Sequence, residues 1–149
     1  MIGYRIDSVK GLFFDRKAVQ NATDRATRRV LSRFGAFVRR GAKSSIRKRK
    51  KPSEPGRPPS SHTGLLKRFI FFGYEPRRRS VVIGPVRLNQ VVGDAPAALE
   101  HGGTSRVVTG NRRRSRRVRT VAIRPRPFMG PAFEREMPKL PAMWANSVK

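Results

Sequence analysis

The chain has 149 residues, of which 37% are apolar and 30% are charged, so it can bury one modest hydrophobic core. Its 35 lysines and arginines and 9 acidic residues give a net charge of +26, which favours nucleic acid, anionic membranes or acidic proteins as partners. Because the chain has no cysteine, disulfide bonds, thiolate metal sites and cysteine nucleophiles are excluded.

A short strand and a long helix are predicted at the start of the chain. Ile2, Tyr4 and Ile6 alternate with other residues at the period of a half-buried strand. Asp15 is expected to cap an amphipathic helix that reaches about residue 45. Its apolar positions are spaced by three and four residues: Val19, Ala22, Ala26, Val30, Phe34, Phe37 and Gly41. The opposite face is dominated by basic residues, so contacts within the fold or with other subunits must stabilise the helix.

A basic loop and a hairpin are predicted next. Residues 46–62 combine a basic run with four prolines, which indicates a mobile loop. Residues 65–72 are rich in aromatic and β-branched side chains and are predicted to form a strand, with a turn over residues 73–76. Residues 80–85 are predicted to be the returning strand. We assign the phenylalanines at 34, 37, 69, 71 and 72 to the core.

The last third of the chain predicts a second hairpin and a terminal helix. Residues 95–103 fit either one helical turn or a short edge strand. Residues 106–109 and 120–123 are expected to pair as strands around a basic connection. Pro131 suits the first turn of a helix, which Pro138 should kink, and the apolar stripe of that helix contains Ala132, Phe133, Met137, Leu140 and Trp144. The expected fold is a single α+β domain over residues 1–149, with a long N-terminal helix, an antiparallel sheet of hairpins, a C-terminal helix, and basic extended loops near 46–62 and 103–119.

The sequence does not assemble a recognisable catalytic site. His62 and His101 have neither metal-binding nor triad spacing, and Asp94 and Glu100 form only a weak catalytic pair. No glycine-rich phosphate loop occurs. We therefore expect a protein that is not an enzyme and that binds no cofactor or metal. No stretch of about eighteen apolar residues and no signal-peptide pattern occur, so we expect a non-secreted protein that does not span a membrane.

Two basic runs are the candidate contact sites for partners or DNA. Guanidinium and ammonium groups gain affinity for nucleic acid by releasing condensed counterions, but they also bind acidic proteins, and charge alone does not distinguish the two. No motif for base-specific recognition is present. The candidate residues are Arg47, Lys48, Arg49, Lys50 and Lys51 in the first run, and Arg112, Arg113, Arg114, Arg116, Arg117 and Arg119 in the second.

Four short segments occur in an order that resembles the neck and tail-component proteins of long-tailed bacteriophages. They are SHTGLLKRFI at 61–70, VIGP at 82–85, APAALEHGG at 95–103 and RPFMGPAF at 126–133. The resemblance covers about residues 15–148. Each segment is short, and the order of the four carries the specificity.

The resemblance implies an α+β subunit of a homo-oligomeric ring, with six-fold or twelve-fold symmetry, in the connector between portal and tail. Such a protein is assembled in the cytoplasm of the bacterial host, lies in the virion, contacts the rings on the portal and tail sides, and lets the genome pass through its lumen, where it could touch DNA non-specifically. Phe128, Phe133 and Trp144 are the expected packing anchors. The alternative function is a nucleic-acid-binding protein without sequence specificity that acts through phosphate contacts.

Overall fold

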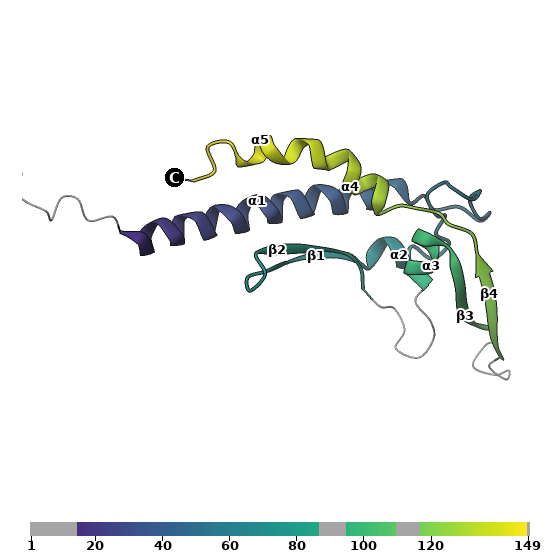
Figure 1. Cartoon of the computed structure of the whole chain (residues 1–149). Coiled ribbons are helices and arrows are strands. Elements are labelled where there is room, and N and C mark those ends of the chain that lie inside the picture. Colours follow the sequence, from purple (N-terminus) through teal and green to yellow (C-terminus); the bar gives the residue numbers. More distant parts are fainter. Residues whose placement is uncertain (1–14, 87–94, 110–116, 149) are drawn as a thin grey trace, which may run out of the picture.

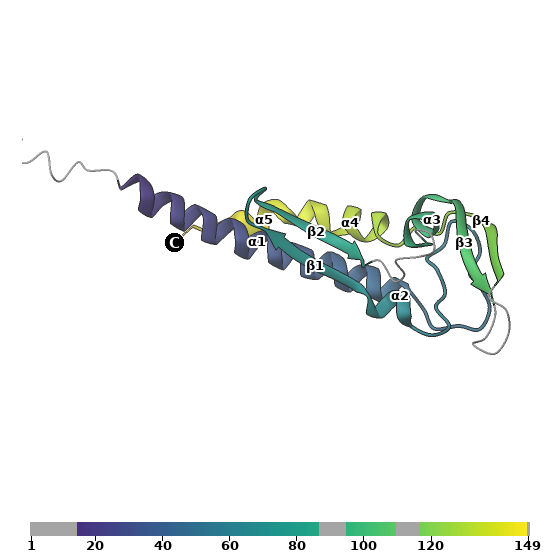
Figure 2. The same cartoon turned by 90° about the horizontal axis from the view of Figure 1, so that it is seen from below.

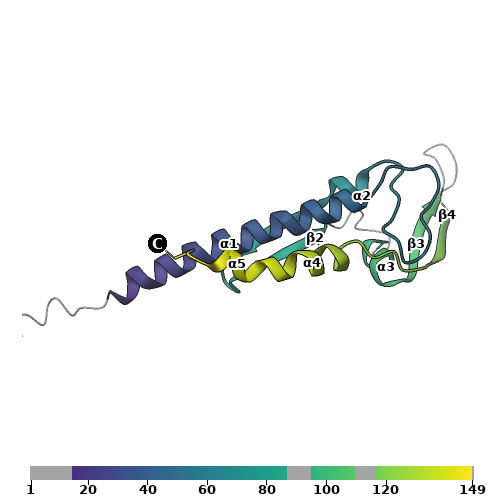
Figure 3. The same ribbon diagram turned by 90° about the horizontal axis from the view of Figure 1, so that it is seen from above.

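The computed structural model describes residues 15–86, 95–109 and 117–148 and has the α+β arrangement that the sequence predicts. The long helix α1 (Arg16–Ser45) forms the spine of an elongated molecule (Figure 1). The β1–β2 hairpin packs on one side of α1 and the C-terminal helices pack on another (Figures 2 and 3). The strand predicted at residues 2–6 lies outside the described residues.

Helix α1 begins and ends where its sequence pattern predicts. The Asp15 carboxylate accepts a hydrogen bond from the Ala18 N–H at 2.9 Å, which satisfies one of the free donors of the first turn. The buried stripe includes Ala26, Val30 and Phe34 and continues through Val38 to Ala42. Phe37, which was assigned to this stripe, is only half-buried.

The first hairpin pairs β1 (Ile70–Glu75) with β2 (Ser80–Pro85) in antiparallel register. Its strand β1 is shorter than predicted, because Leu65–Arg68 form the helical turn α2. Gly64 precedes that turn at φ 76°, a conformation that glycine adopts readily. The predicted turn at residues 73–76 was also wrong: Gly73, Tyr74 and Glu75 belong to the strand, and the chain reverses over residues 76–79.

A second two-stranded unit projects beyond the C-terminal end of α1 (Figure 1). Residues 95–103, for which two structures were open, contain the helix α3 (Ala95–His101). It leads into β3 (Gly103–Thr109), which pairs with β4 (Arg117–Ile123) as predicted. Much of the segment expected as an extended loop near 103–119 therefore consists of paired strand.

Backbone contacts hold the loop over residues 46–62 at several points. Arg47 and Ser60 form a parallel bridge. The Gly56 N–H donates to the Pro125 carbonyl at 2.8 Å, and Arg126 Nε donates to the Ser53 carbonyl at 2.9 Å. These bonds give the proline-rich segment a defined path against the start of the C-terminal region.

The C-terminal segment consists of α4 (Gly130–Glu136), the 3-10 turn η2 (Met137–Lys139) and α5 (Leu140–Trp144). Pro131 lies in the first turn of α4, as predicted. Pro138 lies in η2, where the α-helix is interrupted, because proline lacks the N–H that a continuous helix needs.

One hydrophobic cluster joins these parts to the second half of α1. Its buried members come from α1, from the residue after it, from β1 and from the C-terminal region: Phe34, Val38, Ala42, Ile46, Ile70, Phe128 and Ala132. Gly35 allows the hairpin to approach α1 closely, since a Cβ there would lie 2.8 Å from a methyl carbon of Val81 and 3.0 Å from the Phe72 ring.

Gly35→Ala should destabilise the protein relative to Gly41→Ala, although both changes replace a helical glycine. A methyl group at Gly35 would clash with Val81 and Phe72, whereas at Gly41 it would meet chiefly the movable end of Arg135. Alanine gains about 1 kcal/mol of helix propensity at both sites, and overpacking costs about 1–3 kcal/mol. In urea denaturation followed by circular dichroism, we expect the free energy of unfolding of G35A to lie about 1–3 kcal/mol below that of G41A. Equal stability of the two variants would contradict the close packing at Gly35.

Candidate interaction surfaces

The described residues present several exposed basic and apolar surfaces. Among them, no three His, Cys, Asp or Glu residues lie close enough together to hold a metal ion. His62 lies on the exposed loop, and His101 is exposed at the end of α3. No helix in the described part of the chain is both long enough and apolar enough to cross a bilayer.

The predicted basic residues that the structure describes lie at one end of the molecule. Residues 47–51 are all exposed on the loop beyond α1, and the β3–β4 hairpin lies at the same end (Figure 1). Arg119 is exposed on β4, and Arg117 lies in the same strand. The remaining predicted arginines lie outside the described residues: Arg112, Arg113, Arg114 and Arg116. Together the described positions make this end strongly cationic.

Three of the four segments that carry the family resemblance meet at a single junction. Residues from 82–85, 95–103 and 126–133 line one shallow pocket of about 280 Å³. The fourth segment, 61–70, reaches the same place because Ile70 pairs with Pro85. The order of these segments along the chain therefore corresponds to one packed structure.

The Glu100 carboxylate holds this junction together. It accepts hydrogen bonds from three consecutive backbone N–H groups, those of Phe128 at 2.9 Å, Met129 at 3.0 Å and Gly130 at 2.7 Å. These donors lead into the first turn of α4, where a negative charge is favourable. In the sequence, Glu100 is half of a weak catalytic pair and a member of the 95–103 segment. Its structural role was not predicted, because its partners lie 28 to 30 residues away.

Glu100→Gln should loosen the junction. A glutamine presents one acceptor oxygen and one amide group, so at least one of the three N–H groups would lose its acceptor. Because a hydrogen bond to a charged group contributes about 1.5–3 kcal/mol, we expect the free energy of unfolding to fall by about 2 kcal/mol in urea denaturation. The control is Glu134→Gln on the exposed side of α4, which should change stability by less than about 0.5 kcal/mol. Equal effects of the two changes would rule out this role for Glu100.

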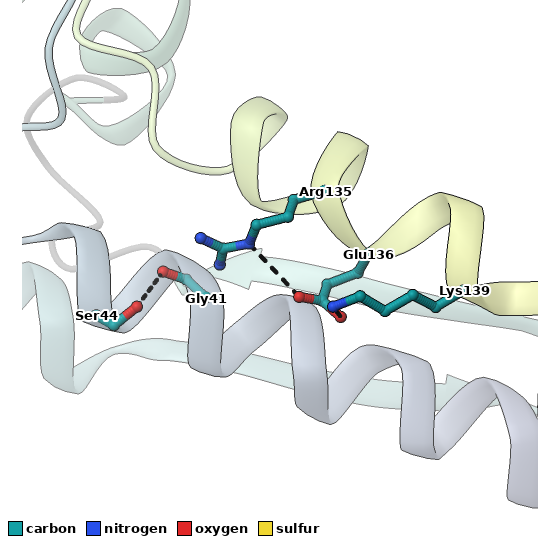
Figure 4. Close-up of polar contacts among 5 residues, drawn as sticks. All are labelled: Gly41, Ser44, Arg135, Glu136 and Lys139. Atoms are coloured by element: carbon teal, nitrogen blue, oxygen red, sulfur yellow. Dashed lines mark hydrogen bonds and ion pairs between the residues drawn. The ribbon is translucent and has the colours of Figure 1, made fainter.

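Glu136 lies at the contact between α4 and α1 (Figure 4). Glu136 is 7% exposed. Its carboxylate accepts a hydrogen bond from Lys139 Nζ at 2.8 Å and lies 3.5 Å from Arg135 Nε. The hydrogen bond from Lys139 lowers the pKa of Glu136, the charges of Lys139 and Arg135 lower it further, and burial opposes them. Nearby, Ser44 Oγ donates to the Gly41 carbonyl at 2.8 Å. The ionised carboxylate therefore keeps two cations beside α1.

Acidification should remove the contribution of Glu136 to stability. Because the pKa of Glu136 is lowered in the folded protein, the stability it adds is fully present above the unfolded pKa of about 4.3 and is lost as the pH falls through the folded pKa. The Tm difference between the parent protein and E136Q should thus be largest near pH 7 and shrink toward about pH 3. Thermal unfolding across this range measures it, with E134Q as the control. A Tm difference that does not vary with pH would contradict the assignment.

Two apolar surfaces remain exposed. The first, the hairpin face, lies on the side of β1–β2 that points away from α1 and consists of Phe69, Phe71, Val82 and Val86. Phe71 is 46% exposed and Val82 is 63% exposed, so the assignment of Phe69 and Phe71 to the core was wrong for the single chain. A strand that is apolar at both odd and even positions is the sequence signal for a hairpin covered on both faces.

The second apolar surface, the C-terminal face, consists of Phe133, Met137 and Trp144. Two of the three expected packing anchors belong to it: Phe133 is 43% exposed and Trp144 is 37% exposed, whereas Phe128 is buried. Phe133 contacts Phe34 edge to face, with ring centroids 5.6 Å apart. Helix α1 lies between this segment and the hairpin (Figure 1), so the two apolar surfaces belong to elements on different sides of α1.

Lys43 occupies the rim of the hairpin face. Burial lowers its pKa, and the neighbouring charges of Arg39 and Lys67 lower it further. Lys43 and Arg39 also lie over the Phe71 ring, 5.9 and 5.8 Å from its centroid. The rim is therefore crowded with positive charge and would accept an acidic group from a partner.

Comparison of the chain with protein-family models, with curated proteins and with solved structures returns no match.

Proposed function

We propose that this protein is a non-enzymatic structural subunit of a bacteriophage virion, a neck or tail-completion ring component at the head–tail interface. The observation that carries the proposal is the pair of different apolar faces on one chain. Four large side chains on the hairpin face and three on the C-terminal face stay exposed in the single subunit. Fully burying an exposed side chain of this size contributes about 1.5–3 kcal/mol. The side chains of the two faces are 37–63% exposed, so covering each one would contribute about half of that.

The arrangement of the faces favours a ring over a two-fold dimer. A two-fold interface uses the same patch on both subunits, whereas contact between two different patches repeats from copy to copy and closes into a ring when the rotation allows. We assign the hairpin face of one copy to the C-terminal face of the next. Six-fold or twelve-fold closure is the symmetry we propose from the family resemblance.

The loop 46–62, whose basic run 47–51 is exposed, and the β3–β4 hairpin fit the role of contact arms. Both lie beyond the end of α1 and carry basic side chains (Figure 1). In a ring, such arms would meet acidic surfaces of the adjacent portal-side or tail-side proteins, or the phosphates of the passing genome. The neighbours would then supply the negative charge that the chain lacks.

Disrupting either apolar face should abolish rings, and mixing the two disrupted proteins should restore one contact. The hairpin-face variant carries Phe71→Ser and Val82→Ser, and the C-terminal-face variant carries Met137→Ser and Trp144→Ser. Each variant alone should be monomeric, while the equimolar mixture should form a heterodimer, because only one intact interface remains between the two. Analytical ultracentrifugation and negative-stain microscopy measure the outcome.

The control is Val19→Ser, which removes an exposed apolar side chain of α1 outside both faces and should leave rings unchanged. A parent protein that stays monomeric at every concentration, alone and with portal or tail-tube protein, would overturn the proposal. Rings formed by either double variant alone would also overturn it. A mixture without heterodimer would show that the two faces do not bind each other.

The second candidate function is nucleic-acid binding without sequence specificity. It is favoured by the exposed arginines along α1, among them Arg25, Arg28, Arg29 and Arg33. A monomer whose affinity for duplex DNA falls steeply with added salt would support this function over the first.

A further inference from the structure

A groove lies between α1 and the β1–β2 turn, away from the basic loops. Its volume is about 790 Å³, and five arginines line it. Arg25 and Arg28 come from α1, and Arg77, Arg78 and Arg79 come from the turn. Segments about 50 residues apart in the sequence thus form one cationic surface that neither segment forms alone.

An ion pair joins the turn to the helix. Arg79 Nη2 lies 3.2 Å from Asp24 Oδ1, and the Arg79 backbone has φ 48°, a region that residues other than glycine seldom occupy. Within the described residues, Glu75 lies 3.7 Å from Arg78, and no acid pairs with Arg25, Arg28 or Arg77. The two acids beside the groove therefore pair with Arg78 and Arg79, and among the described residues the other three guanidinium groups have no acidic partner.

We propose that this groove binds the phosphodiester backbone of a nucleic acid. Guanidinium groups match phosphate oxygens with paired hydrogen bonds, and every cation that lines the groove is an arginine. From Arg25 the basic row continues along α1 through Arg29 to Arg33, at steps of four residues, or about 6 Å. A regularly charged polymer complements such a row, whereas an acidic peptide would gain little from a groove whose other lining is mainly polar.

This inference rests on the proposed function only for the source of the nucleic acid, which would be the genome in the lumen of the ring. The groove belongs to a single chain, so its binding is measurable whether or not rings form. DNA affinity and oligomeric state are therefore separate readouts of the same sample.

The test compares two full-length variants that lose the same charge. The groove variant carries Arg25→Gln, Arg28→Gln, Arg77→Gln and Arg78→Gln, and the loop variant carries Arg47→Gln, Lys48→Gln, Arg49→Gln and Lys50→Gln. All eight residues are exposed, and circular dichroism checks the fold. Fluorescence anisotropy with a labelled mixed-sequence duplex of about 30 base pairs, at about 50–200 mM NaCl, gives Kd and its salt dependence.

We expect the groove variant to bind at least about tenfold more weakly than the parent, with the slope of log K against log salt reduced by about 2–4. The loop variant loses contact-arm charges, so its affinity should also fall, but by less than that of the groove variant at the same salt. A third variant has lysine at the four groove positions. It keeps the positive charge but loses the paired N–H donors of the guanidinium group, so its DNA affinity should lie between that of the parent and that of the glutamine variant.

Equal losses in the groove and loop variants would overturn the proposal. Groove-dependent binding of poly-glutamate as tight as that of DNA would also overturn it, since the ligand would then be an acidic peptide. If rings form but their DNA affinity does not depend on the groove, the DNA-binding role of the groove is refuted and the proposed ring function stands. If the protein binds DNA through the groove but never forms rings, the ring function is refuted and the DNA-binding role of the groove stands.

Discussion

The packing of the β1–β2 hairpin and the C-terminal segment depends on one stretch, from Phe34 in α1 to Ile46 just after it, which supplies the buried surface that both contact. The β1–β2 hairpin and the C-terminal segment have no core of their own, and a two-stranded hairpin is at best marginally stable without a packed face. Gly35 lets the hairpin approach on one side, and Gly41 faces Ala132 on another. Because α1 packs against only one side of the hairpin and one side of the C-terminal segment, apolar side chains of both remain exposed.

Sequence reasoning predicted the parts whose signals are local. The 3.6-residue period and the Asp15 cap gave α1, and the apolar runs near residues 80–85 and 120–123 gave strands. Leu65–Arg68 were predicted as strand from their composition, but Gly64 in a left-handed conformation starts a helical turn there. Here the backbone geometry of one residue outweighed the propensities of those after it.

The candidate sites were harder to predict because they join distant segments. Glu100 reaches backbone donors that begin at Phe128, and Arg25 shares its groove with Arg77, so no window of sequence contains either arrangement. The basic loops were predicted as contact sites because their charges are adjacent in the sequence, whereas the arginines of the groove are scattered along it. The exposure of Phe69 and Phe71 depends on which side of the hairpin α1 covers. The alternation of apolar and polar residues along a strand cannot predict the covered side when both sides are apolar.

The elongated shape also explains how a chain with a net charge of +26 can fold. A helix of 30 residues is about 45 Å long, several times the Debye length of about 8 Å at physiological salt, so arginines at its two ends barely repel each other. Side-by-side association of copies would bring their basic rows together and raise the repulsion. A phosphate backbone lying in the grooves would neutralise it. In the proposed assembly, nucleic acid that binds the ring more tightly than the free chain would favour ring closure. By the same linkage, ring closure would raise the affinity for nucleic acid.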